Sequence, residues 1–185
     1  MSLERATVDS PIGPTTGRLG MWTFLASDVM SFGGLLAAYA YLRTRAQTWP
    51  EAGTRLDVRL AAVMTFVLLA SSLTMAFAVD AARAGRARGT AGWLAATLAL
   101  GAAFLGGQAW EWTALARHGY DFAADHASST FYVVTGWHGA HVAAGVIYLT
   151  VVVARRRLDA VPSAALFWQF LDAVWILIFT ALYLV

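Results

Sequence analysis

The 185-residue chain has no cysteine and no lysine, and charged residues make up only 13% of it. The absence of cysteine excludes disulfides, thiolate metal sites and cysteine nucleophiles. A soluble domain carries about 25% charged residues, so this composition indicates a chain that lies mostly in lipid. All 13 basic residues are arginines in short segments between apolar runs, which does not make the exposed basic surface that nucleic-acid binding requires.

Proline is scarce, and none of the four prolines lies within the long apolar runs. A helix that rises about 1.5 Å per residue needs about 20 residues to cross the hydrocarbon core of a membrane. Five runs are long enough: 19–42, 58–79, 92–115, 130–153 and 163–184. The sequence therefore predicts an all-α fold, with a polar tail over residues 1–17 and a five-helix transmembrane bundle over residues 18–185.

The arginines also predict the orientation of the bundle, because cytoplasmic loops carry the excess of positive residues. Eight arginines fall on the side of the N-terminus and five on the other side. We therefore expect the N-terminus in the cytoplasm and the C-terminus on the opposite face of the membrane.

The first run contains one acid, Asp28, close to the middle of the membrane. An unpaired carboxylate there costs about 2.5–3.5 kcal/mol on insertion scales, so Asp28 should face other helices. His141 of the fourth run lies at a matching depth, since the two residues are about 14 and 17 Å from opposite faces. We expect a neutral Asp28 that donates to a neighbour, with an Asp28–His141 ion pair as the second arrangement. Alternatively, Asp28 only forms a polar contact between two helices and takes part in no reaction.

Polar residues recur on one face of each of the last three runs, in alternating steps of three and four residues. They are Thr97, Gly101, Phe104, Gln108 and Glu111, then Thr135, His138, His141, Gly145 and Tyr148, then Gln169, Asp172, Ile176 and Thr180. These faces should point inward. We therefore expect a buried polar network of Gln108, Glu111, His138, His141, Gln169 and Asp172.

Aromatic residues near the ends of the runs indicate where the membrane surface lies. Trp22, Trp93 and Trp168 fall near the inner ends, and Trp110, Trp112 and Tyr183 near the outer ends. Arg18, Trp22 and Trp168 are the candidates for contact with lipid headgroups.

The most specific candidate metal ligands are His138 and His141, since they lie three residues apart on one predicted helix. The other two histidines, His118 and His126, fall in a loop, so facing helices cannot each supply the axial histidine of a membrane haem. A two-metal site with Asp28, Glu111 or Asp172 is a weaker option. The chain also lacks a glycine-rich phosphate loop and a serine elbow. We therefore expect no metal and no catalytic residue in this chain.

Four segments together resemble subunit III of the haem-copper oxidases, such as cytochrome c oxidase, in its short five-helix form. The segments are RLGMWTFLASDVMSFGG (18–34), GQAWEW (107–112), STFYVVTGWHGAHVAAG (129–145) and FWQFLDAVWILIF (167–179). The resemblance implies a subunit without haem or copper of its own, whose partner subunits carry them. It also implies contact with subunit I, association with subunit II and small subunits, bound phospholipid, and support of proton uptake and durability.

Two residues depart from the family pattern. Asp28 stands where the family usually has a carbodiimide-reactive glutamate, and Gln169 stands where it usually has a histidine. The resemblance extends to an accessory protein of nitric oxide reductases, and it leaves the electron donor open between cytochrome c and a quinol. A third hypothesis, a proton-coupled transporter that uses Asp28 and Asp172, is disfavoured by the absence of proline-broken helices.

Overall fold

The computed structural model describes residues 14–47, 49–50 and 55–185, with side chains from residue 19 onward. Its long helices are α1 (Pro14–Arg45), α2 (Val58–Arg83), α3 (Ala87–Arg117), α4 (His126–Ala154) and α5 (Val161–Phe179). A short 3-10 helix, η1 (Leu158–Ala160), precedes α5, and a π-helical turn, η2 (Thr180–Leu184), follows it. The five long helical segments are each long and apolar enough to span a membrane, which confirms the predicted fold.

The helices extend beyond the apolar runs, because polar residues rather than hydropathy set their ends. The start of α1 at Pro14 makes the last residues of the expected tail helical. Helix α4 starts at His126 rather than at residue 130, since the Asp125 carboxylate accepts the backbone N–H of Ser128 at 2.7 Å and caps the helix. Asp57 caps α2 in the same way, through the N–H groups of Arg59 and Leu60 at 3.0 Å.

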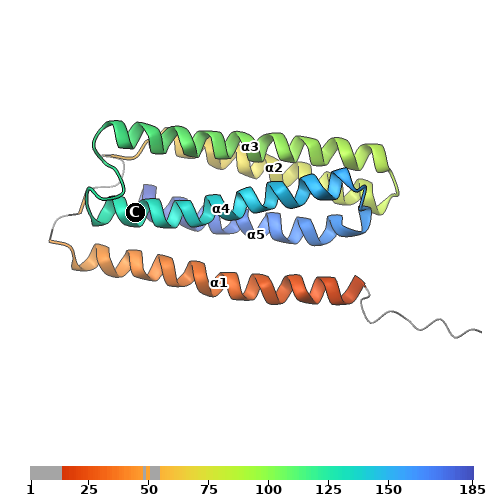
Figure 1. Cartoon of the computed structure of the whole chain (residues 1–185), viewed down its shortest axis with the longest axis horizontal. Helices are drawn as coiled ribbons and strands as arrows, with labels where there is room; N and C mark the ends of the chain where they lie inside the picture. The colour runs from red at the N-terminus through yellow and green to blue at the C-terminus, as the bar shows by residue number, and fades with distance from the viewer. Residues whose placement is uncertain (1–13, 48, 51–54) are drawn as a thin grey trace, which may run out of the picture.

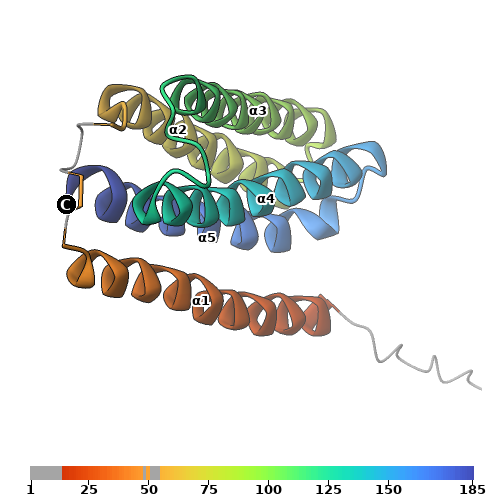
Figure 2. The same cartoon turned by 60° about the vertical axis from the view of Figure 1, so that its left-hand side comes forward.

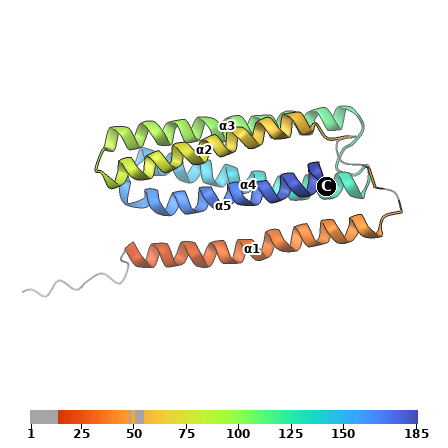
Figure 3. The same ribbon diagram turned by 180° about the vertical axis from the view of Figure 1, so that it is seen from behind.

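Helices α2 and α3 lie side by side, α4 and α5 lie next to them, and α1 flanks the bundle (Figures 1 and 2). Among the described residues, α1 packs against α4 and α5 and has no comparable contact with α2 or α3. The view from behind shows the same order (Figure 3). The start of α1 and the end of the chain lie at opposite ends of the bundle, as an odd number of spans requires (Figure 1).

Two tryptophans of α5 form the centre of the core. The indole N–H of Trp168 donates to Ser71 at 2.9 Å, and that of Trp175 donates to Thr65 at 2.9 Å, so both bind hydroxyls of α2. The Trp168 ring lies against Gly101 of α3, where a Cβ would come within 2.6 Å of it. The close packing of α3 on α5 therefore depends on a glycine at this position.

The surface of the bundle is rich in large apolar side chains. Met30, Phe66, Trp110 and Ile147 are exposed to 77%, 74%, 68% and 65%. Such a surface is costly in water and suits lipid tails, in agreement with the spanning helices.

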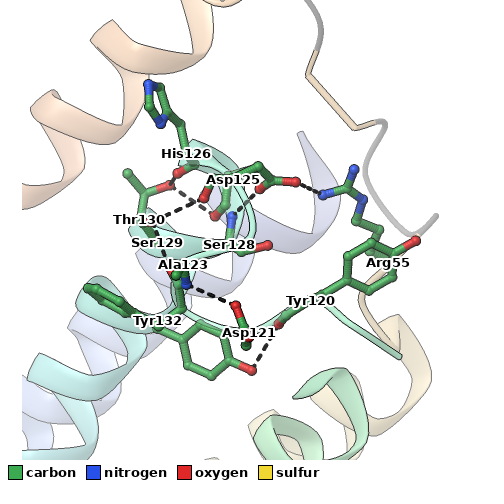
Figure 4. Close-up of polar contacts among 12 residues, drawn as sticks. Arg55, Tyr120, Asp121, Ala123, Asp125, His126, Ser128, Ser129, Thr130 and Tyr132 are labelled. Carbon is green, nitrogen blue, oxygen red and sulfur yellow. Dashed lines mark hydrogen bonds and ion pairs between the residues drawn. The ribbon is translucent and has the colours of Figure 1, made fainter. Parts of the chain in front are cut away.

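At the end of the bundle where the chain terminates, a polar cluster joins the α3–α4 connection to the segment before α2 (Figure 4). Arg55 pairs with the carboxylate of Asp125, and its guanidinium lies 4.4 Å from the centre of the Tyr120 ring. The Tyr132 hydroxyl donates to the backbone oxygen of Tyr120 at 3.1 Å. These contacts hold the start of α4, the helix that carries His138 and His141.

Candidate functional site

Asp28 of α1 and His141 of α4 meet inside the bundle. The Asp28 Oδ2 and His141 Nε2 atoms lie 3.3 Å apart, and their side chains are only 11% and 14% exposed. The Phe32 ring covers the imidazole at 5.3 Å between ring centres. The matching depths derived from the sequence therefore correspond to a real contact.

The hydrogen bonds around the imidazole limit where protons can lie. Nδ1 of His141 is 2.8 Å from the backbone oxygen of Trp137, which can only accept, so Nδ1 carries a proton. In the neutral imidazole Nε2 is then an acceptor, and Asp28 must supply the proton between them. In the charged imidazole Nε2 donates to the Asp28 carboxylate instead. The 3.3 Å contact is close enough for an ion pair, whereas Asp28 Oδ2 makes no hydrogen bond to the described residues.

A second buried group lies between α3, α4 and η2. The Tyr183 hydroxyl donates to Glu111 at 2.7 Å, and both residues are at most 2% exposed. Gln108 and His138 are 4% and 0% exposed, and their side-chain nitrogen and oxygen atoms have no hydrogen-bond partner among the described residues. His138 stacks on Trp175 at 5.2 Å between ring centres. The predicted inward stripe of α3 is confirmed, since all five of its residues are buried.

Asp172 forms a third, separate group, because its carboxylate accepts the hydroxyl of Ser72 from α2. The prediction for Gln169 is wrong, since its side chain is exposed. The face of α5 that carries Trp168 and Trp175 packs into the core. The polar face of α5, which carries Gln169 and Asp172, therefore lies at the side of the helix next to α2. Asp172 alone reaches a buried position from that face, at 5% exposed.

The predictions for Trp168 and Tyr183 are also wrong, since each is 1% exposed and neither can lie among lipid headgroups. Their polar atoms bind Ser71 and Glu111 instead. Sequence position alone cannot distinguish an interfacial aromatic from a core one, because both types lie near helix ends. Trp22 is 57% exposed and stays a candidate, and the side chain of Arg18 lies outside the described part of the structure.

Phe32 of α1 contacts both histidines of α4, at 5.3 Å from the centre of the His141 ring and 6.3 Å from that of His138. His138 also lies against Phe104 and Trp175. In the described residues no three side chains among histidines and acids come together in a way that could hold a metal ion.

The model of the family "Cytochrome c oxidase subunit III" matches residues 13–185. The chain belongs to this family. It is 36% identical to cytochrome c oxidase subunit 3 of Thermostichus vulcanus, over 90% of this chain and 86% of the relative. Identity to the Corynebacterium diphtheriae cytochrome c oxidase subunit 3 is also 36%, over 93% of this chain and 89% of the relative.

The family also includes a protein named for a different electron donor. Quinol oxidase subunit 3 of Bacillus subtilis is 34% identical, over 91% of this chain and 88% of the relative. Membership identifies the chain as a haem-copper oxidase accessory subunit and confirms the resemblance of the four motifs. The nitric oxide reductase and transporter hypotheses are not favoured, since the relatives are named as oxidase subunits.

Proposed function

We propose that the chain is a non-catalytic subunit that supports subunit I of a proton-pumping terminal oxidase in a bacterial plasma membrane. Subunit II and small subunits complete the assembly. Haem and copper belong to the partner subunits, and this chain contributes no active site. Its N-terminus lies in the cytoplasm, its C-terminus lies in the periplasm, and phospholipid is bound near Arg18 and Trp22.

The observation that carries this proposal is the contact between Asp28 and His141. The Asp28 Oδ2 and His141 Nε2 atoms lie 3.3 Å apart, a distance that suits an ion pair inside the chain. Such a pair suits a group that stores or relays a proton near the midplane, and it stabilises the contact of α1 with α4. We assign to Asp28 the carbodiimide-reactive position of the family. The side chain of Asp28, which is shorter than the usual glutamate, contacts His141 there.

The test is to purify the intact complex from native membranes through a tag on this chain. The expected result is co-purification of a large haem-copper subunit and of oxygen-reducing activity, while the subunit dissociated from the complex retains no stoichiometric haem or metal. Purification of the chain alone, or with a haem b and non-haem iron enzyme, would contradict the proposal. Oxidation of reduced cytochrome c or of a quinol by the same preparation then identifies the donor.

A further inference from the structure

A small pocket lies between the start of α2 and the end of α3, at the end of the bundle where the chain terminates (Figures 1 and 3). Its volume is about 200 Å³, and Glu111 of α3 forms part of its wall. Asp57, Trp110 and His118 also line the pocket, and all three are exposed. The pocket therefore leads from the surface to a carboxyl group that is only 2% exposed.

The Glu111 carboxyl group has one oxygen that is bound by the protein and one that is not. Oε2 accepts the hydroxyl of Tyr183 at 2.7 Å, whereas Oε1 has no hydrogen-bond partner among the described residues. Gln108, one turn deeper on the same face of α3, is 4% exposed, and both polar atoms of its amide lack a partner in the same part of the chain. Buried polar atoms without a hydrogen bond are costly, and ordered water is their usual partner. These atoms therefore suit water that enters through the pocket.

The site suits a proton and water better than a metal ion. Within the described ranges no three histidine and acid side chains come together in a way that could hold a metal. Asp57 already accepts the N–H groups of Arg59 and Leu60 as the cap of α2. An acid inside a membrane-spanning helix is typical of proton relays, because a carboxyl group beside water can gain and lose a proton without a further ligand.

The surroundings of Glu111 do not hold its carboxyl group in the ionised form. The charged and titratable side chains that face this region from the neighbouring elements are Arg55, Asp57, His118, Tyr132, His138 and Tyr183. Arg55 is a permanent cation, but it pairs with Asp125. No ion pair among the described residues includes Glu111. A carboxyl group that no cation fixes in its charged form can exchange its proton.

His118 provides a group for proton exchange at the surface end of the pocket. Its Nδ1 atom lies 2.7 Å from the backbone oxygen of Ala114, which can only accept, so Nδ1 carries a proton and Nε2 remains for exchange with water. Histidine is a common proton shuttle. His118 and Glu111 are seven residues apart along the helix, or about 10 Å. Water in the pocket can bridge that distance.

We propose that Glu111 is a proton-binding site that exchanges with the aqueous phase at the C-terminal end of the bundle, through water held in this pocket. The water binds Oε1 of Glu111, and Tyr183 positions the carboxyl group through Oε2. The site is separate from the Asp28–His141 pair, because it lies on α3 and has its own opening to the surface. It does not depend on which oxidase the chain joins, so it can fail while the proposed function stands.

Three variants separate the carboxyl group from the pocket that leads to it. Glu111→Gln removes the exchangeable proton and keeps an acceptor for Tyr183. Ala114→Phe fills the pocket, because Ala114 is half-buried and lines it. Ala109→Phe is the matched control, since Ala109 is exposed on the same helix and does not line the pocket. Ala114→Leu is a smaller filler that gives the same comparison if the thermal midpoint of Ala114→Phe falls.

The measurement is infrared difference spectroscopy of the purified complex, in H₂O and after rapid transfer to D₂O. A protonated carboxylic acid has a carbonyl band that shifts on deuteration, and its loss in Glu111→Gln assigns the band. We expect this band to disappear reversibly as the pH rises. Its shift in D₂O should be about tenfold slower in Ala114→Phe than in wild type, because water then reaches the carboxyl group only when the helices open locally. Ala109→Phe should exchange as fast as wild type.

Two results would overturn the proposal. Identical spectra of wild type and Glu111→Gln, or a Glu111 band that no change of pH removes, would show that the carboxyl group does not exchange a proton with the solvent. Equal exchange rates in Ala114→Phe and Ala109→Phe would show that the pocket is not the route.

Discussion

Asp28 and His141 belong to helices that start at opposite ends of the bundle, yet their side chains meet at 3.3 Å. The backbone oxygen of Trp137 fixes a proton on Nδ1 of His141, so Nε2 faces the acid. The same helix turn of α4 also binds α1 through the Trp137 indole, which donates to Ser31 at 3.0 Å. The pair is therefore held by its surroundings as well as by its own attraction.

Asp28→Asn should preserve assembly and most of the initial oxygen consumption, because the chemistry of the proposed oxidase belongs to another subunit. We expect the effect to appear as slower proton uptake or as faster loss of activity over many turnovers. Carbodiimide labelling of the wild type distinguishes the two proton arrangements, since the reaction needs a protonated carboxyl. A variant with intact haem and copper but no initial turnover would make Asp28 an obligatory part of the proton path and contradict the accessory role.

Gly101→Ala should destabilise the bundle by about 1–3 kcal/mol, because the new Cβ would lie 2.6 Å from the Trp168 ring. Gly106→Ala on the same helix is the control, since its Cβ would meet nothing within 4 Å. That variant should be neutral or slightly stabilising, as alanine is the better helix former. Thermal unfolding followed by tryptophan fluorescence measures both. Equal midpoints for the two variants would show that α3 and α5 are not packed as described.

Tyr183→Phe should destabilise the chain by about 1–3 kcal/mol, because it leaves the buried Glu111 Oε2 atom without its donor at 2.7 Å. Tyr41→Phe is the control, since Tyr41 is 60% exposed. The thermal midpoint of the purified complex measures the loss. An unchanged midpoint in Tyr183→Phe would argue against the buried hydrogen bond between α3 and η2.

The cap at Asp125 should stabilise the protein in a pH-dependent way. Burial raises the pKa of this carboxyl, but the N–H of Ser128 and the Arg55 guanidinium outweigh burial and hold the pKa below the ordinary 3.8. A lowered pKa stabilises the folded state above pH 3.8, and the contribution disappears as the pH falls through the folded-state pKa. Asp125→Ala should therefore lower the thermal midpoint at neutral pH, and the gap to wild type should narrow in acid.

Asp125→Asn serves as the reference for that experiment, because an amide oxygen still accepts at the N-cap while the charge on Arg55 is left unpaired. The difference between Asp125→Asn and Asp125→Ala should stay constant with pH. If the gap between wild type and Asp125→Ala is the same in acid and at neutral pH, the ionised cap has no role in stability.

The orientation of the bundle has a direct test. A reporter fused after Val185 should be active only outside the cytoplasm, because five spans and the arginine bias predict a periplasmic C-terminus. A matched fusion in the α2–α3 connection at Gly85 should report the cytoplasmic side. Cytoplasmic activity of the Val185 fusion would mean that the orientation or the number of spans is wrong.

Hydropathy by itself determined the number of spans and the depth of each polar side chain. The run lengths predicted the five membrane-spanning segments, and counting along the runs placed Asp28 and His141 at one level. The inward face of α3 was also predictable, since its residues from Thr97 to Glu111 keep one helical period and all are buried. These properties depend on the rise of a helix, which is the same in every helix, and on the local sequence.

Only the tertiary structure decided which way α5 is turned about its axis and which neighbour each side chain meets. Gln169 and Trp168 are adjacent in sequence, yet one is exposed and the other 1% exposed, because one residue turns a helix by about 100°. The rotation follows from the space that Gly101 leaves for the Trp168 ring and from the hydroxyls that α2 offers to both indoles. That complementarity lies between helices far apart in the chain, so no local pattern contains it.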